Sequence, residues 1–202
     1  MLSQALAEAL AREGHEVAVV PEFLREFCDH AGRTPREDEQ AGIAEEQTRR
    51  IDEAARRHAV VIADTTALTI AVYSDQVFGD RSLYDSALRA HRRQATLTLL
   101  MALDLPWQQD GLIRDGPHVR PPVDRLFRET LSGAGLPYAV VSGTGPQRLV
   151  NALSAVRHAL LRASDADPDQ ESSPMRWQHR CDRCGDADCE RALLPRQGPS
   201  DR

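Results

Sequence analysis

A short apolar run at residues 60–63 ends abruptly on the carboxylate of Asp64 and the hydroxyls of Thr65 and Thr66. A β-branched run of this length, without polar alternation, predicts a strand buried on both faces of a parallel sheet. Ligands of such sheets gather beyond the carboxyl ends of the strands, so we expect Asp64 at the rim where a site forms. A carboxylate there can hold Mg²⁺ against nucleotide phosphates. Asp64 could equally cap the following helix, and the local sequence leaves both readings open.

A second group of reactive side chains lies near the end of the sequence, in the pattern H-x-C-x₂-C-x₄-C. Clustered thiols in a cytoplasmic protein bind metal more often than they form disulfides. We therefore expect a closed, structural Zn²⁺ site with tetrahedral geometry, held by His179, Cys181, Cys184 and Cys189. Cys28 is either a buried thiol or a replacement for His179 as fourth ligand. The alternative for the cluster is a redox pair or free thiols.

Composition excludes several classes of function. The net charge of −6 disfavours nucleic acid as a partner, because phosphate backbones need a basic face. No apolar run reaches the length of a membrane span, and the first residues lack a signal peptide, so we expect a cytoplasmic protein with no membrane contact. All 25 basic residues are arginine. A mechanism that needs lysine cannot be completed by these residues.

Predicted strands and helices alternate along the chain, which favours an α/β fold with a parallel sheet and helices on both faces. A helix at residues 2–13 comes first, with no strand before it. A capping box that begins at Thr34, with proline at the first helical position, predicts a helix to about residue 57. Three domains follow: the α/β domain at 1–162, an acidic linker at 163–174 and a small Cys-rich tail at 175–202. The expected strands are 16–20, 58–63, 96–103 and 138–142, and the other expected helices are 21–27, 65–78, one from about 82, 119–133 and 145–162.

Three segments together resemble one family. Residues 21–26 follow one strand, residues 63–66 follow the next, and residues 110–116 lie in a later loop. Over residues 1–160 the chain resembles the ribosylnicotinamide kinase domain of the bacterial NadR protein and its stand-alone relatives in the P-loop ATPase superfamily. The resemblance implies an enzyme that uses ATP and Mg²⁺ to convert nicotinamide riboside, or a similar small molecule, to its mononucleotide for NAD salvage.

The sequence departs from that family at its start. The family begins with a strand and a Gly-x-x-x-x-Gly-Lys-[Ser/Thr] loop, which hold the β- and γ-phosphates before a helix like 2–13. We expect a truncated reading initiated at an internal Met and inactive in this form. The alternative is a non-catalytic binding or regulatory homologue, docking or forming a homo-oligomer through its charged helix and zinc tail.

The missing strand would lie between the strand that ends at Asp64 and the strand that ends near Asp104. Its two neighbours would then be about 9–10 Å apart, twice the normal inter-strand spacing. We expect them either to collapse together or to leave backbone groups without partners.

The resemblance gives roles to the residues that follow the first two strands. Asp64 would orient Mg²⁺ or its water shell, and Thr65 and Thr66 would steady it or cap the next helix. Glu22 would accept a proton from the 5′-hydroxyl of the substrate or bind ribose hydroxyls, or it is simply a first-turn acid. Arg25 would pair with phosphate or with Glu22.

The later loops carry further candidates. Arg114 and Arg120 bracket a lid-like segment and would neutralise charge on the transferred phosphoryl group. Trp107 would stack on a pyridine or purine ring, or pack in the interior. Ser142 and Gly143 lie where related kinases contact adenine through backbone groups, although a plain glycine turn explains them equally well.

Overall fold

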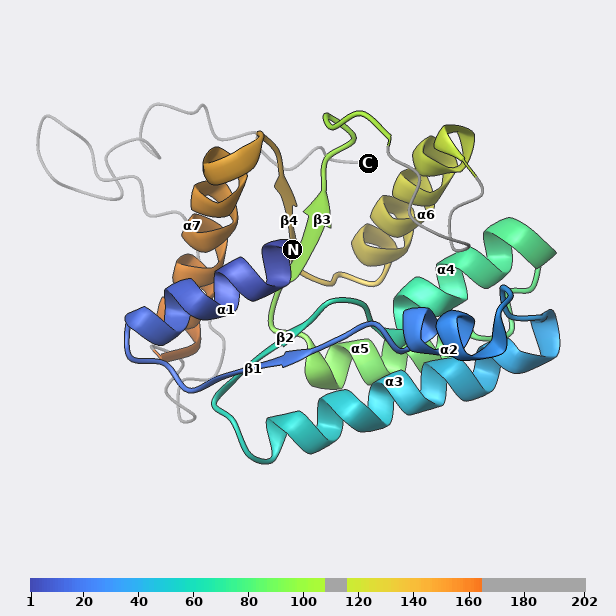
Figure 1. Ribbon diagram of the computed structural model, residues 1–202, viewed down its shortest axis with the longest axis horizontal. Coiled ribbons are helices and arrows are strands. Elements are labelled where there is room, and N and C mark those ends of the chain that lie inside the picture. Colours follow the sequence, from blue (N-terminus) through green and yellow to red (C-terminus); the bar gives the residue numbers. More distant parts are fainter. Residues whose placement is uncertain (108–115, 165–202) are drawn as a thin grey trace, which may run out of the picture. The chain divides into compact units, whose positions relative to one another are not determined.

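The computed structural model describes residues 1–107 and 116–164 (Figure 1). Met1–Ala163 form one compact unit, and the predicted linker and Cys-rich tail lie outside the described residues, apart from the end of the last helix. Helices and short strands alternate, as predicted. In chain order they are α1 (Leu2–Arg12), β1 (Val17–Val20), α2 (Phe23–Ala31), the 3₁₀ turn η1 (Glu37–Glu39), α3 (Gln40–Ala55), β2 (Val60–Ala63), α4 (Ala67–Phe78), α5 (Tyr84–Gln94), β3 (Thr98–Met101), the 3₁₀ turn η2 (Pro117–Val119), α6 (Arg120–Gly133), β4 (Tyr138–Val141) and α7 (Gly145–Ser164).

The four described strands form two separate pairs. β1 lies parallel to β2, with Val17 opposite Val60. β3 lies parallel to β4, with Thr98 opposite Tyr138. No ladder joins β2 to β3 within the described residues. Parallel pairing was predicted, but the single continuous sheet was not obtained, and the break falls where the sequence predicted a gap between two strands.

Helices cover both faces of the β1–β2 pair. On one face, Leu6 and Leu10 of α1 belong to a cluster that includes Val60. On the other face, Ile51 of α3 packs with Val20. The α1 cluster also contains β4 and α7 residues, and Figure 1 shows α1 beside α7. α1 therefore connects the two strand pairs through side-chain packing rather than through backbone hydrogen bonds.

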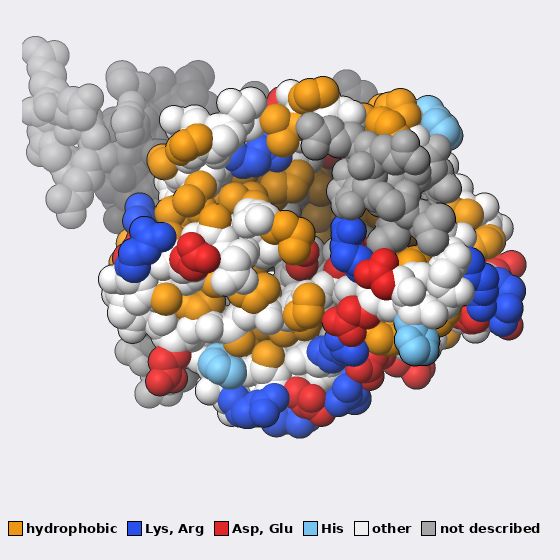
Figure 2. Space-filling model, in the orientation of Figure 1, with side chains coloured by type: hydrophobic (Ala, Val, Ile, Leu, Met, Phe, Trp, Pro, Cys, Tyr) orange, Lys and Arg blue, Asp and Glu red, His pale blue; other side chains and the backbone are white. Residues whose placement is uncertain are grey.

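A large cavity follows the edges of β2 and β3. Its volume is about 1950 Å³, and every residue of both strands lines it. Figure 2 shows a recess in this face of the molecule with hydrophobic side chains inside it. The prediction that residues 60–63 are buried on both faces is wrong, because all four are only half-buried. The cavity explains this exposure, since it leaves one edge of β2 without a neighbouring strand.

Two predicted helix starts had different outcomes. α4 nearly matches the predicted helix 65–78: Thr66 is its N-cap, one of the two roles left open for this residue, and Gly79 ends it with φ +72°. The capping box at Thr34 is wrong. Instead, the amide of Arg36 donates to Oε2 of Glu39 at 2.8 Å, and Arg33 pairs with the same carboxylate at 2.7 Å. These contacts open η1, so α3 itself starts only at Gln40.

Candidate functional site

Gln47, a buried residue of α3, holds together the two loops that follow β1 and β2. Its Oε1 accepts a hydrogen bond from the amide of Phe23 at 2.8 Å. Its Nε2 donates to the carbonyl oxygens of Thr65 at 3.0 Å and Pro21 at 3.3 Å. Only 1% of Gln47 is exposed, so all these bonds are shielded from water. The carboxyl ends of β1 and β2 are thereby fixed as one rim.

Sequence reasoning missed Gln47, although a signal was present. Ile43, Gln47 and Ile51 share one face of α3, and all three are buried. A polar side chain on a buried helical stripe must find hydrogen-bond partners inside the protein, so it indicates a buried polar contact.

Glu22 and Asp64 stand at this rim, each directly beyond a strand. Glu22 is the N-cap of α2 in an extended conformation. Its carboxylate lies 3.7 Å from Nη2 of Arg25, and its side chain is 15% exposed. The amide of Asp64 donates to the carbonyl of Val20 at 3.0 Å, while the Asp64 side chain is exposed. One carboxylate is therefore largely shielded and the other faces solvent.

The two threonines after Asp64 behave differently. Oγ1 of Thr65 is buried and has no hydrogen-bond partner within the described part of the chain. Oγ1 of Thr66 lies 3.4 Å from Nδ1 of His91, whose Nε2 lies 2.8 Å from Oγ1 of Thr98. His91 is buried, and this burial lowers its pKa. Thr66 is thus an N-cap whose side chain contacts His91 of α5, whereas the Thr65 hydroxyl is a buried polar group without a partner among the described residues.

Trp107 and Arg120 flank the other side of the cavity. Nε1 of Trp107 is buried without an acceptor among the residues described. Nη1 of Arg120, at the start of α6, donates to the carbonyl of Leu105 at 2.8 Å. Arg120 therefore fixes the segment after β3 rather than reaching over the rim. Arg114 lies outside the described residues.

Asp104 and Arg148 together hold the turn after β4 at Gly143, and we call these two residues the clamp. The amide of Gly143 donates to Oδ2 of Asp104 at 2.6 Å, and its carbonyl accepts a bond from Nε of Arg148 at 2.8 Å. Arg148 also pairs with the Asp104 carboxylate. The Gly143 amide, with Arg148, lowers the pKa of Asp104. The carbonyl of Ser142 accepts from Asn151 at 3.0 Å. Both backbone groups of Gly143 are thus occupied within the chain.

One cavity brings seven of the predicted site residues together. Ser142 and Gly143 are not among the residues that line it. The predicted residues that do line it are Glu22, Arg25, Asp64, Thr65, Thr66, Trp107 and Arg120. The aromatic residues Tyr73 and Phe127 also line this cavity. The site therefore combines carboxylates at a strand rim with aromatic rings and two orphaned polar atoms.

The sequence of this chain matches one known protein family. A family model described as an AAA domain matches residues 3–148. The chain belongs to this AAA domain family. The family is of the P-loop NTPase type, so its members are nucleotide-binding domains. This confirms the broader part of the predicted resemblance. A comparison with the curated proteins found no match.

The rim of this AAA domain fits only one part of a Mg²⁺–nucleotide complex. Mg²⁺ is commonly held by one or two carboxylates together with waters and substrate phosphates, and Asp64 could supply such a carboxylate. Within residues 1–107 and 116–164, no group of three metal-ligating side chains forms a protein cage. The same residues contain no lysine, so no P-loop lysine is present to hold the triphosphate.

Of the residues predicted to bind zinc or to stay a buried thiol, only Cys28 lies in the described part of the chain. Cys28 in α2 is a free thiol with 1% exposure, and its burial raises its pKa. A raised pKa and burial make it an inert packing residue. The predicted zinc ligands His179, Cys181, Cys184 and Cys189 lie outside the described residues, so that site stays a prediction.

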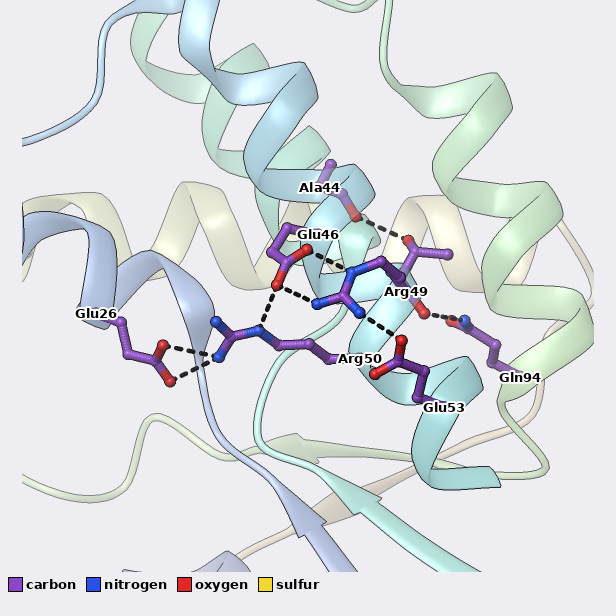
Figure 3. Close-up of polar contacts among 8 residues, drawn as sticks. Glu26, Ala44, Glu46, Arg49, Arg50, Glu53 and Gln94 are labelled. Atoms are coloured by element: carbon purple, nitrogen blue, oxygen red, sulfur yellow. Dashed lines mark hydrogen bonds and ion pairs between the residues drawn. The ribbon is translucent and has the colours of Figure 1, made fainter. Parts of the chain in front are cut away.

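The charged helix α3 pairs its own charges. Nε of Arg49 lies 2.7 Å from Glu46, and Arg49 also pairs with Glu53 (Figure 3). Arg50 bonds Glu46 at 2.8 Å and Glu26 of α2 at 2.7 Å. The Arg50–Glu26 pair joins α3 to α2, whereas the pairs of Arg49 lie within α3. None of the described helices combines the length and apolarity needed to cross a bilayer.

Proposed function

We propose that this AAA domain is the substrate-binding part of a small-molecule kinase of the ribosylnicotinamide kinase type, which phosphorylates the 5′-hydroxyl of nicotinamide riboside. The observation that carries the proposal is the double contact of Gln47 with Phe23 and Thr65. It holds the loops of Glu22 and Asp64 side by side at the carboxyl ends of two parallel strands, where ligands of α/β sheets bind.

Each residue of the rim has a role in this proposal. The shielded carboxylate of Glu22 accepts hydrogen bonds from ribose hydroxyls and is positioned to take the proton of the 5′-hydroxyl. Arg25 fixes Glu22 through their ion pair. Trp107 and Tyr73 line the same cavity. Their ring faces suit a cationic pyridine, since a cation is attracted to the face of an aromatic ring.

Phosphoryl transfer needs more than this rim. The residues present supply a carboxylate for Mg²⁺, but no lysine for the phosphates of ATP. Most of the catalytic stabilisation in such reactions comes from groups that hold these phosphates. We therefore expect riboside binding from this 202-residue chain and no measurable transfer from ATP.

The experiment is calorimetric titration of the protein with nicotinamide riboside. The riboside should bind, and Glu22→Gln should weaken binding by about tenfold, the loss expected for one charge-assisted hydrogen bond. The matched control is Glu8→Gln, on the exposed face of α1, which should leave affinity unchanged. Absence of riboside binding by the wild-type protein, or equal affinity of wild type and Glu22→Gln, would reject the proposal.

A second candidate is a non-catalytic binding or regulatory protein with a structural zinc site. The lack of any lysine in the sequence favours it. In that case the rim has no need to bind a nucleoside, so the same titration separates the two candidates. Zinc binding by the tail is a separate expectation, which metal analysis of the purified protein would test.

A further inference from the structure

Three successive residues after β2 are each held by a different element of the fold. The amide of Asp64 donates to the last carbonyl of β1 at 3.0 Å. The carbonyl of Thr65 accepts a hydrogen bond from Gln47 of α3, also at 3.0 Å. Oγ1 of Thr66 lies 3.4 Å from Nδ1 of His91 in α5. The loop that carries the Asp64 carboxylate is therefore fixed from a strand and from two helices.

The third of these contacts comes from a buried imidazole. Only 3% of His91 is exposed, and its other ring nitrogen, Nε2, lies 2.8 Å from Oγ1 of Thr98 at the start of β3. Each ring nitrogen thus meets one hydroxyl, which is able both to donate and to accept a hydrogen bond. No ladder joins β2 to β3 within the described residues. The imidazole therefore forms a polar bridge between β3 and the loop after β2.

The helix that carries this imidazole is itself braced against α3. Nε2 of Gln94, one turn after His91, donates to the carbonyl of Thr48 in α3 at 3.0 Å (Figure 3). The same nitrogen donates to Oδ1 of Asp52 at 2.7 Å. Thr48 directly follows Gln47, so one turn of α3 holds both the loop after β2 and α5. The imidazole can therefore set a position, because its helix is tied to the helix that already holds the loop.

We propose that His91 is a positioning residue of the candidate site, which sets the loop of Asp64 through its contact with Thr66. The side chain of Asp64 is exposed, so its place at the rim depends on the backbone that carries it. A loop held in advance in its binding conformation lowers the entropic cost of binding a ligand. His91 touches no reacting atom and acts through Thr66. The inference rests on the proposed function only for the identity of the ligand at the rim.

The test replaces the imidazole by the two amide side chains that each keep one of its contacts. Oδ1 of asparagine occupies the place of Nδ1, so His91→Asn keeps an acceptor for Thr66 and loses the contact with Thr98. The amide of glutamine occupies the place of Nε2, so His91→Gln keeps Thr98 and loses Thr66. Amide hydrogen exchange of the intact protein, resolved by residue, is measured for both variants and for wild type.

The two variants should differ at the loop. The Asp64 amide should exchange at least about tenfold faster than wild type in His91→Gln, but within about threefold of wild type in His91→Asn. The Ile62 amide, in the β1–β2 ladder, should be unchanged in both variants. The affinity for nicotinamide riboside should fall by about threefold to tenfold in His91→Gln alone. The matched control is His158→Gln, at an exposed position of α7, which should change none of these quantities.

The order of the two variants decides the role of His91. The proposal is overturned if the Asp64 amide exchanges equally in both variants, or faster in His91→Asn. It is equally overturned if the Ile62 amide is accelerated too, because His91 would then stabilise the strand pair rather than the loop. Equal riboside affinity of wild type and His91→Gln would also overturn it. If the wild-type protein binds no riboside, the proposed function fails by itself, since the exchange rates of Asp64 still decide the role of His91.

Discussion

The side-chain amide of Gln47 donates a hydrogen bond to the carbonyl oxygen of Thr65 at 3.0 Å. The same side chain accepts a bond from the amide of Phe23. One buried residue of α3 therefore fixes the positions of two loops that are far apart in sequence. The candidate site depends on this residue, which has no role in chemistry of its own.

Replacing Gln47 with leucine should lower the free energy of unfolding by about 1–3 kcal/mol, because backbone groups of Phe23 and Thr65 lose their buried partners. The same substitution at exposed Glu45 should have little effect. Urea denaturation measures both variants. Equal stability of Gln47→Leu and wild type would show that water replaces the lost bonds.

Some of the fold was predictable because its signals are local. The bounds of α4 lie close to the predicted range 65–78, since an N-cap residue such as Thr66 and a left-handed glycine such as Gly79 act on their own helix. The cap at Thr34 failed for a tertiary reason. Arg33 and the amide of Arg36 both bind Glu39, and this contact displaces the start of the helix.

The site was predictable only in part, for a similar reason. Glu22 and Asp64 follow strands, so their place at a rim follows from the α/β pattern. The partners of Gln47 are 18 to 26 residues away in the chain. The helical stripe of α3 indicates that Gln47 needs buried partners, but which partners it finds depends on packing that no local pattern encodes. The exposure of β2 escaped prediction because an apolar run indicates a buried strand only when neighbours exist on both edges.

His91 should make stability depend on pH. Burial lowers its pKa, and within the described residues its ring is hydrogen-bonded by the hydroxyls of Thr66 and Thr98. Below an unfolded-state pKa of about 6.5 the unfolded chain binds the extra proton first. The free energy of unfolding should therefore fall as pH decreases from there toward the lowered pKa of the folded state.

Thermal unfolding across this pH range, compared between wild type and His91→Gln, isolates the contribution of this one histidine. The variant should lose stability less steeply on acidification. The control is His30→Gln at an exposed position of α2, which should follow the wild type. If the stability of wild type and of His91→Gln falls equally with pH, the lowered pKa of His91 is not the cause of the pH dependence.

Arg148 should stabilise the turn after β4. Only 8% of Arg148 is exposed, and it binds the Gly143 carbonyl and the Asp104 carboxylate. Arg148→Met should cost about 1.5–3 kcal/mol, the range for hydrogen bonds that involve a charged group. The Gly143 amide should also exchange faster. Arg162→Met, at an exposed position of α7, should change neither quantity, and an unaffected Gly143 amide in Arg148→Met would argue against the clamp.

The two neighbouring arginines of α3 should differ in effect. Arg50 pairs with Glu26 of α2, and its guanidinium lies 4.5 Å from the centre of the Phe23 ring. Arg50→Ala should therefore destabilise the α2–α3 contact by about 1 kcal/mol. Arg49 makes only exposed pairs on its own helix, so Arg49→Ala should shift the melting temperature by no more than about 2 °C. A larger drop in melting temperature for Arg49→Ala than for Arg50→Ala would contradict this prediction.

The most direct measurement is an amide chemical-shift titration of the protein with nicotinamide riboside. If the rim binds the substrate, the largest shifts will occur at the amides of Phe23, Asp64, Thr65 and Trp107. The Gln47→Leu variant will show weaker shifts at these residues. Shifts that gather on a different surface, or no shifts at saturating riboside, would contradict the placement of a nucleoside site at the rim.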